Sequence, residues 1–257
     1  RSIFFSNDDE VKHFLEKRSI ENSKKHQQPA TLNVKSNLDK LTLNDMQVFR
    51  FNFRHEKNQK ILYLHGGYNT LQPSPFHWRL LDKLTLNTLH EVVLPIYPKS
   101  PDYHYLETFK AIRDVYNQLV EEVGADNIVM MGDGSGGGLA LSFVQSLIND
   151  NQEVPRKLFL LSPLLDATLT NPNITQTLEE NDILVSRFGV HQLMKSWTND
   201  LPLSDARISP LYGTLKGLPP IYMYGGGREI LSPDMHAFTH ALEECGNDVE
   251  FKEYPKM

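Results

Sequence analysis

The feature that most constrains the fold is an alternation of short apolar runs and longer amphipathic segments from Ile61 onward. The runs KILYL at 60–64 and NIVMMG at 127–132 are typical of buried strands, because they are apolar, short and followed by glycine. Residues 108–124 have helical periodicity and stop at a glycine. Strands that alternate with helices form βαβ units, so the sequence predicts an α/β fold with a mostly parallel sheet.

The same patterns place the other elements. We expect strands at 46–53, 90–98, 157–163, 219–227 and 249–255, and helices at 8–18, 139–150 and 234–246. Residues 166–209 interrupt the rhythm, since they hold no strong strand pattern and 182–200 look helical. An insertion between two sheet strands is typical of a lid. We therefore expect one α/β domain over 46–257, with a cap formed by 166–209 and by the polar segment 1–45.

Composition argues against several classes of function. The net charge is −6, which gives no support to nucleic-acid binding or to a basic membrane-surface patch. No apolar stretch approaches the roughly 18 residues of a membrane span. Cys245 is the single cysteine, so no internal disulfide can form, and we expect a cytoplasmic protein. The sequence is compatible with a homodimer.

The segment GDGSGGG at 132–138 joins a strand pattern to a helix pattern and has three interpretations. Gly132, Gly134 and Gly137 fit the dinucleotide-binding fingerprint G-x-G-x-x-G. That fingerprint needs an acid about 20 residues on, at the end of the next strand. The acids near that distance precede the next strand. A dinucleotide-binding protein is therefore the least favoured interpretation.

The second interpretation is a nucleophile elbow, a sharp turn that presents a reactive side chain at a helix N-terminus. Ser135 is the only hydroxyl residue of the cluster. The third is a turn without chemistry, in which the serine caps the helix. The motif LHGGY at 64–68 favours the elbow, because backbone N–H groups of a His-Gly-Gly loop can face a substrate carbonyl.

In this combination the chain resembles the hormone-sensitive-lipase-like branch of the α/β-hydrolase esterases, from about Ile61 to Met257. The matching motifs are YLHGGY (its oxyanion loop), YPKSPDY (its Tyr-Arg-Leu-Ala-Pro-Glu stretch), LSPLLD, LPPIYMYGGGREIL (its catalytic acid) and EYPKM (the lead-in to its catalytic histidine). The resemblance implies an α/β-hydrolase fold over 46–257. It also implies hydrolysis of small-molecule carboxylic esters with short or medium acyl groups, with no cofactor and no metal.

The elbow departs from the family at its reactive position. The family has Gly-Asp-Ser-Ala-Gly-Gly, and this chain has Gly-Asp-Gly-Ser-Gly-Gly. An ungapped match puts Gly134 at the nucleophile position and Ser135 at an oxyanion N–H position. We prefer this match, which predicts weak or absent esterase activity. A slip of one residue makes Ser135 the nucleophile, with Gly136 as the oxyanion donor.

The resemblance also assigns the surroundings of the elbow. Gly66 and Gly67 would supply the other oxyanion N–H groups. Four residues would line the substrate pocket: His65, Tyr68, Asp133 and Gly134. A further interpretation stays open, in which a catalytically impaired homologue binds an ester, a lactone or an acyl ligand in this pocket.

The catalytic acid matches Glu229, since glutamate can orient a histidine as aspartate does. Asp234 is the alternative acid. In the family the histidine lies two residues after the methionine that matches Met257, so we expect Glu229 to point toward that place. We expect His236 and His240 at the surface of a helix.

Overall fold

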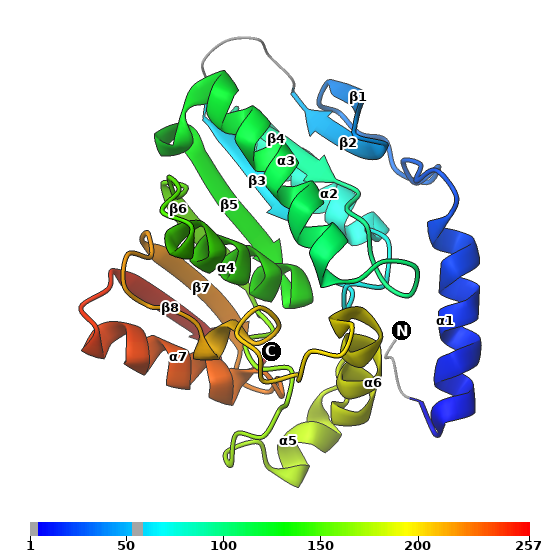
Figure 1. The fold of residues 1–257 in the computed structure, drawn as a ribbon, viewed down its shortest axis with the longest axis vertical. Coiled ribbons are helices and arrows are strands. Elements are labelled where there is room, and N and C mark those ends of the chain that lie inside the picture. The colour runs from blue at the N-terminus through cyan, green and yellow to red at the C-terminus, as the bar shows by residue number, and fades with distance from the viewer. Residues whose placement is uncertain (1–4, 53–58) are drawn as a thin grey trace.

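The computed structural model describes residues 5–52 and 59–257, and within them eight strands form one sheet in the order β1-β2-β4-β3-β5-β6-β7-β8 (Figure 1). The strands are β1 Leu38–Leu43, β2 Met46–Phe51, β3 Lys60–Leu64, β4 Glu91–Pro95, β5 Ile128–Asp133, β6 Lys157–Leu161, β7 Ile221–Gly226 and β8 Val249–Tyr254. The pairs from β4 to β8 are parallel, and β1 and β2 pair antiparallel. The predicted mostly parallel α/β sheet is confirmed.

Helices cover both faces of this sheet (Figure 1). They are α1 Asp8–Asn22, α2 Pro75–Thr88, α3 Tyr105–Val123, α4 Gly134–Asn149, α5 Gln176–Asn181, α6 Arg187–Thr198 and α7 Ser232–Glu244. One face packs against α3, α4 and α7 in the larger apolar core. The other face packs against α2 in a smaller core around Trp78, Phe49 and Phe51. Because β3 and β5 are parallel neighbours, their carboxyl ends lie side by side at one end of the sheet.

The expected strand and helix positions agree with the structure to within a few residues, with three additions. The helices α2 and α5 and the edge strand β1 had no predicted counterpart. The segment 1–45 was expected to belong to the cap, but β1 lies within it and pairs with β2 along its whole length. Residue 53 of the strand expected at 46–53, and residues 1–4 of the N-terminal segment, lie outside the described residues.

The insertion at 166–209 contributes α5 and α6 and lies over the carboxyl ends of the strands together with α1 (Figure 1). Trp197 of α6 is buried, and its Nε1 donates a hydrogen bond of 2.9 Å to Thr108 Oγ1. Asn22 at the end of α1 donates to the carbonyl oxygens of Thr70 and Ser100. Hydrogen bonds thus join α6 to the helix α3, and α1 to the loops after β3 and β4.

Candidate active site

The sharp turn after β5 is centred on Gly134. Its φ is +51°, in the left-handed region, and α4 begins at the same residue. Ser135 is not among the residues with positive φ, so it already has a helical backbone. The prediction that Gly134 occupies the turn is confirmed.

Close packing on both sides of the turn supports the same centre. A Cβ atom added at Gly132 would lie 2.5 Å from the Gly136 carbonyl oxygen, and one added at Gly136 would lie 2.5 Å from the His65 carbonyl oxygen. Such approaches leave no room for a side chain at either position. A Cβ added at Gly134 would meet no described atom within 4 Å. The two glycines that must be small therefore flank Gly134 symmetrically, as a nucleophile elbow requires.

The Ser135 side chain is buried beside the loop that follows β3. It is 6% exposed, and its Oγ accepts a hydrogen bond of 3.3 Å from the backbone N–H of Asn69. The side chain lines a small cavity of about 10 Å³ together with Met194 and Trp197 of α6. The insertion therefore lies on the same side of the sheet as Ser135, where a cap over the site was expected.

Asp133, expected in the substrate pocket, joins the elbow to the His-Gly-Gly loop that follows β3. Its Oδ1 accepts hydrogen bonds from Tyr63 Oη at 2.7 Å and from the Gly66 N–H at 2.9 Å. Both carboxylate oxygens lie 3.1 Å from His77 Nε2. Burial acts to raise the pKa of Asp133, but the hydrogen bonds and the charge of His77 outweigh it and hold this pKa below its ordinary value.

The bond to Asp133 corrects the expectation for Gly66, because its N–H is engaged inside the protein. The next two residues have positive φ, +120° at Gly67 and +57° at Tyr68. Their N–H groups donate no backbone hydrogen bond to another described residue. The N–H groups of Gly67 and Tyr68, which follow Gly66 in the same loop, are thus two donors without a described backbone acceptor. Tyr68 Oη donates to the Leu184 carbonyl oxygen, which links this loop to the cap.

His65, also expected in the pocket, is instead a buried support of the loop. It is fully buried and stacks on Tyr97, with 4.7 Å between the ring centroids. Tyr97 Oη donates a hydrogen bond to the His65 carbonyl oxygen. Burial holds the pKa of His65 well below its ordinary value, so the imidazole is neutral. The ring is enclosed by protein and does not line a substrate pocket, which corrects the expectation.

The half-buried carboxylate of Glu229 lies at the carboxyl ends of β6 and β7. Its Oε1 accepts hydrogen bonds from Ser162 Oγ at 2.9 Å and from the Gly226 N–H at 3.0 Å. Its buried Oε2 has no partner among the described residues, and burial raises the pKa of Glu229. A Cβ added at Gly226 would lie 2.8 Å from Glu229 Oε1 and 2.6 Å from the Met257 carbonyl oxygen. Glu229 therefore lies beside Met257, in the predicted direction.

Asp234, the alternative acid, is also buried, at the start of α7. Asn171 Nδ2 donates to its Oδ1 at 2.9 Å, and its Oδ2 has no described partner. Burial raises the pKa of Asp234 to about 6. The contact with Asn171 turns this carboxylate toward the 166–209 segment, whereas Glu229 faces the chain at Met257.

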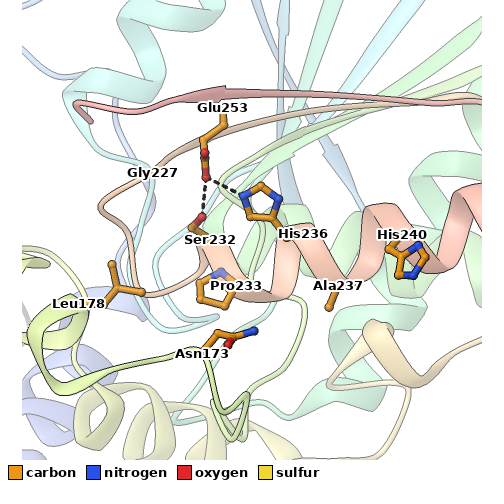
Figure 2. A pocket seen from close by; sticks show the side chains of 9 residues that line it. All are labelled: Asn173, Leu178, Gly227, Ser232, Pro233, His236, Ala237, His240 and Glu253. Carbon is orange, nitrogen blue, oxygen red and sulfur yellow. Dashed lines mark hydrogen bonds and ion pairs between the residues drawn. The ribbon is translucent and has the colours of Figure 1, made fainter.

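A separate cavity of about 590 Å³ lies between α7, the end of β8 and the cap (Figure 2). Ser232 Oγ donates to Glu253 Oε1 at 2.7 Å, and His236 Nε2 lies 2.9 Å from the same oxygen. The carboxylate stands between the hydroxyl and the imidazole, so His236 does not contact the serine as a general base would. His236 and His240 are exposed, as predicted.

Three residues of the site were missed in the sequence: Tyr63, Asn69 and His77. Tyr63 lies inside an apolar strand, and His77 comes three residues after a serine. These positions were weak indications that the two side chains have polar partners. No sequence pattern indicates the hydrogen bond from Asn69 to Ser135, because its donor is a backbone N–H, which every residue except proline has.

The fold and the elbow define an α/β hydrolase, and the chain belongs to this family: a family model described as the alpha/beta hydrolase fold matches residues 61–257. An esterase from Acinetobacter venetianus is 34% identical over 201 residues, covering 77% of this chain and 66% of the relative. A triacylglycerol lipase from Mycobacterium tuberculosis is 30% identical over 211 residues, covering 82% and 44%. This chain thus spans two thirds or less of these relatives.

Solved structures extend the likeness. A crystal structure of a Staphylococcus aureus protein assigned as an esterase is 62% identical, with a TM-score of 0.98, and covers 100% of this chain and 87% of that one. An esterase of the bacterial hormone-sensitive lipase family shares the fold at 21% identity, with a TM-score of 0.81, covering 98% and 90%. The predicted resemblance is confirmed. No helix in the described part of the chain has the length and apolar character to cross a membrane.

Proposed function

We propose that the protein hydrolyses small-molecule carboxylic esters with short or medium acyl groups, at low turnover. Relatives named esterase and lipase support the reaction class. The observation that carries the proposal is the hydrogen bond from the Gly66 N–H to Asp133, because it fixes the oxyanion loop against the elbow. Turnover is low because the elbow residue, Gly134, has no nucleophilic side chain.

The proposed roles follow from this geometry. The N–H groups of Gly67 and Ser135 stabilise the negative charge that develops on the substrate oxygen. Glu229 orients the histidine that the resemblance places two residues after Met257, since its Oε2 is buried and has no described partner. The α4 N-terminus adds a favourable field.

Turnover of p-nitrophenyl acetate by the full-length protein tests the proposal. We expect slow hydrolysis above the buffer rate, and we expect a higher rate in the double variant Gly134→Ser, Ser135→Ala, which restores the family elbow. Strong wild-type activity that is lost in Ser135→Ala and not recovered in the double variant would instead assign the nucleophile to Ser135. No turnover in wild type or double variant would contradict the proposal.

A second candidate function is ligand binding without turnover. It is favoured by one observation: the only hydroxyl of the elbow, on Ser135, accepts a hydrogen bond from the Asn69 N–H and lines a cavity of only about 10 Å³. Thermal stabilisation by an ester or a lactone that the protein does not hydrolyse would support this function.

Two further proposals concern context. We propose that the protein acts in the cytoplasm, supported by the single, exposed and unpaired Cys245. We also propose that the protein forms a homodimer, and sedimentation analysis would test this assembly.

A further inference from the structure

We propose that a divalent transition-metal ion such as Zn²⁺ binds in the cavity between α7, β8 and the cap, held by the imidazoles of His236 and His240 (Figure 2). The proposed ester hydrolysis uses neither histidine, so the inference does not rest on that reaction. Both side chains line the cavity, which has a volume of about 590 Å³. The cavity therefore has room for the ion and for water molecules that complete its coordination.

The first argument is the spacing of the two histidines. His236 and His240 are four residues apart within α7, so their side chains lie on one face of the helix, one turn apart. Two histidines at this spacing on a helix bind zinc in metalloproteases. The His240 side chain is 73% exposed, and its contact with Glu244 at 3.5 Å lies in solvent and contributes little. The His240 ring can therefore turn toward an ion held at the Zn–N distance of about 2 Å.

The second argument is the way in which His236 is oriented. Its Nε2 lies 2.9 Å from Glu253 Oε1, and Ser232 Oγ donates to the same oxygen at 2.7 Å. The Ser232 hydrogen bond, and then His236, outweigh burial and hold the pKa of Glu253 below its ordinary value, so the carboxylate is ionised and only accepts. In the neutral ring Nε2 therefore carries the proton, and Nδ1 has the lone pair. Histidines that bind a metal typically donate their other N–H to a carboxylate, which is the arrangement of His236 and Glu253.

The chemistry of these groups selects the kind of ligand. The negative charge of Glu253 disfavours an anion in the cavity. Imidazole nitrogen suits Zn²⁺, Cu²⁺ and Ni²⁺, whereas Ca²⁺ and Mg²⁺ prefer oxygen ligands. In the part of the chain that the structure describes, no three histidine, cysteine or acidic side chains are placed to hold a metal ion together. The site therefore has two protein ligands, with Glu253 as the partner of His236, and binds more weakly than a closed four-ligand zinc site.

Calorimetric titration of ZnCl₂ into the metal-free, full-length protein without a histidine tag tests the inference. We expect one ion per chain, and an affinity lower by about tenfold or more in His236→Gln and in His240→Gln. His13→Gln is the matched control, because His13 is also exposed on a helix, α1, which has no second histidine. We expect His13→Gln to retain the wild-type affinity. No binding by the wild type, or equal affinities in wild type and His240→Gln, would overturn the inference.

Two further measurements separate the proposed site from ions bound elsewhere on the surface. Glu253→Gln should lower the Zn²⁺ affinity about tenfold, because the oriented His236 loses its charged partner. Glu250→Gln is the control, since Glu250 is exposed on the opposite face of β8 and should keep the wild-type affinity. With Cu²⁺ as the probe, the electron paramagnetic resonance spectrum should show coupling to two imidazole nitrogens. Equal affinities in the two glutamine variants, or copper coupled to fewer than two nitrogens, would overturn the inference.

Discussion

Gly136 packs against the end of β3 so closely that even a methyl group cannot replace its hydrogen. An added Cβ would collide with the carbonyl oxygens of Leu64 and His65. Both are backbone atoms of a central strand and the loop that follows it, so they cannot move aside cheaply. We expect Gly136→Ala to lower the free energy of unfolding by about 2 kcal/mol or more. Urea unfolding measures this change, and a Gly136→Ala variant as stable as wild type would contradict the prediction.

The same residues show what the sequence determines at this scale. The ungapped match to the family elbow predicted that Gly134 occupies the turn, as its φ of +51° shows. It was not enough to predict the donors of the oxyanion loop, because the Gly66 N–H is engaged by a carboxylate 67 positions away along the chain. Pairing of that kind depends on the register of β3 against β5, which an apolar run does not encode.

At the scale of elements, α1 is hydrogen-bonded to the domain through Asn22 and through Ser19, whose Oγ donates to Asp102 Oδ1 at 2.6 Å. The Asn22 Nδ2 donates to Thr70 at 2.9 Å and to Ser100 at 3.1 Å, in the two loops that follow β3 and β4. We expect Asn22→Ala to lower stability by about 1 kcal/mol and to speed proteolytic cleavage near α1, because two carbonyl acceptors lose their donor. Glu21→Ala is the control, since its ion pair with Lys24 is exposed and contributes little. Equal cleavage rates in both variants would contradict this role of Asn22.

Elements with a clear period were predictable, and those defined by their partners were not. The α3 segment alternates apolar and polar residues at helical spacing, and the α4 segment is an apolar run that is buried over most of its length. The α2 segment carries proline at its first position, and only Trp78, Leu81, Asp82 and Thr85 are buried on it. The β1 strand is mostly exposed and forms through pairing with β2. Its sequence therefore lacked the apolar alternation that marks a strand.

At the scale of the whole molecule, charged side chains at the two ends of the sheet differ in how they are paired. At the amino ends of β3 and β4, Lys60 and Glu91 form a buried ion pair, and Glu122 joins it through Lys60. Hydrogen bonds and charges from Arg50 and Lys60 outweigh burial and lower the pKa of Glu122 to about 2. At the carboxyl ends, Glu229 Oε2 has no partner among the residues that the structure describes, and burial raises the pKa of Glu229. Compensated charge supports the fold, and the uncompensated carboxylate lies where the site is proposed.

Acid sensitivity of the whole fold should arise partly from His26, which is held neutral. Trp78 Nε1 donates to its Nε2 at 3.1 Å, a bond that needs an unprotonated nitrogen. Burial, and then the charge of Lys99, lower the pKa of His26 from 6.5 to about 4. Between pH 4 and 6.5 the unfolded chain therefore binds more protons than the folded one. Stability from this group is complete above pH 6.5 and is lost as the pH falls toward 4.

Replacing His26 by glutamine tests whether stability falls with pH in this direction because of His26. Glutamine can still accept the Trp78 hydrogen bond and does not titrate, so His26→Gln should flatten the pH dependence of the free energy of unfolding between pH 4 and 6.5. We expect the difference to reach about 1–2 kcal/mol, after a reduction for the partial exposure of His26. Urea unfolding across this pH range measures it. His240→Gln is the matched control, because the His240 side chain is 73% exposed and should leave the slope unchanged. An equal slope in wild type and His26→Gln would show that other groups set the acid response.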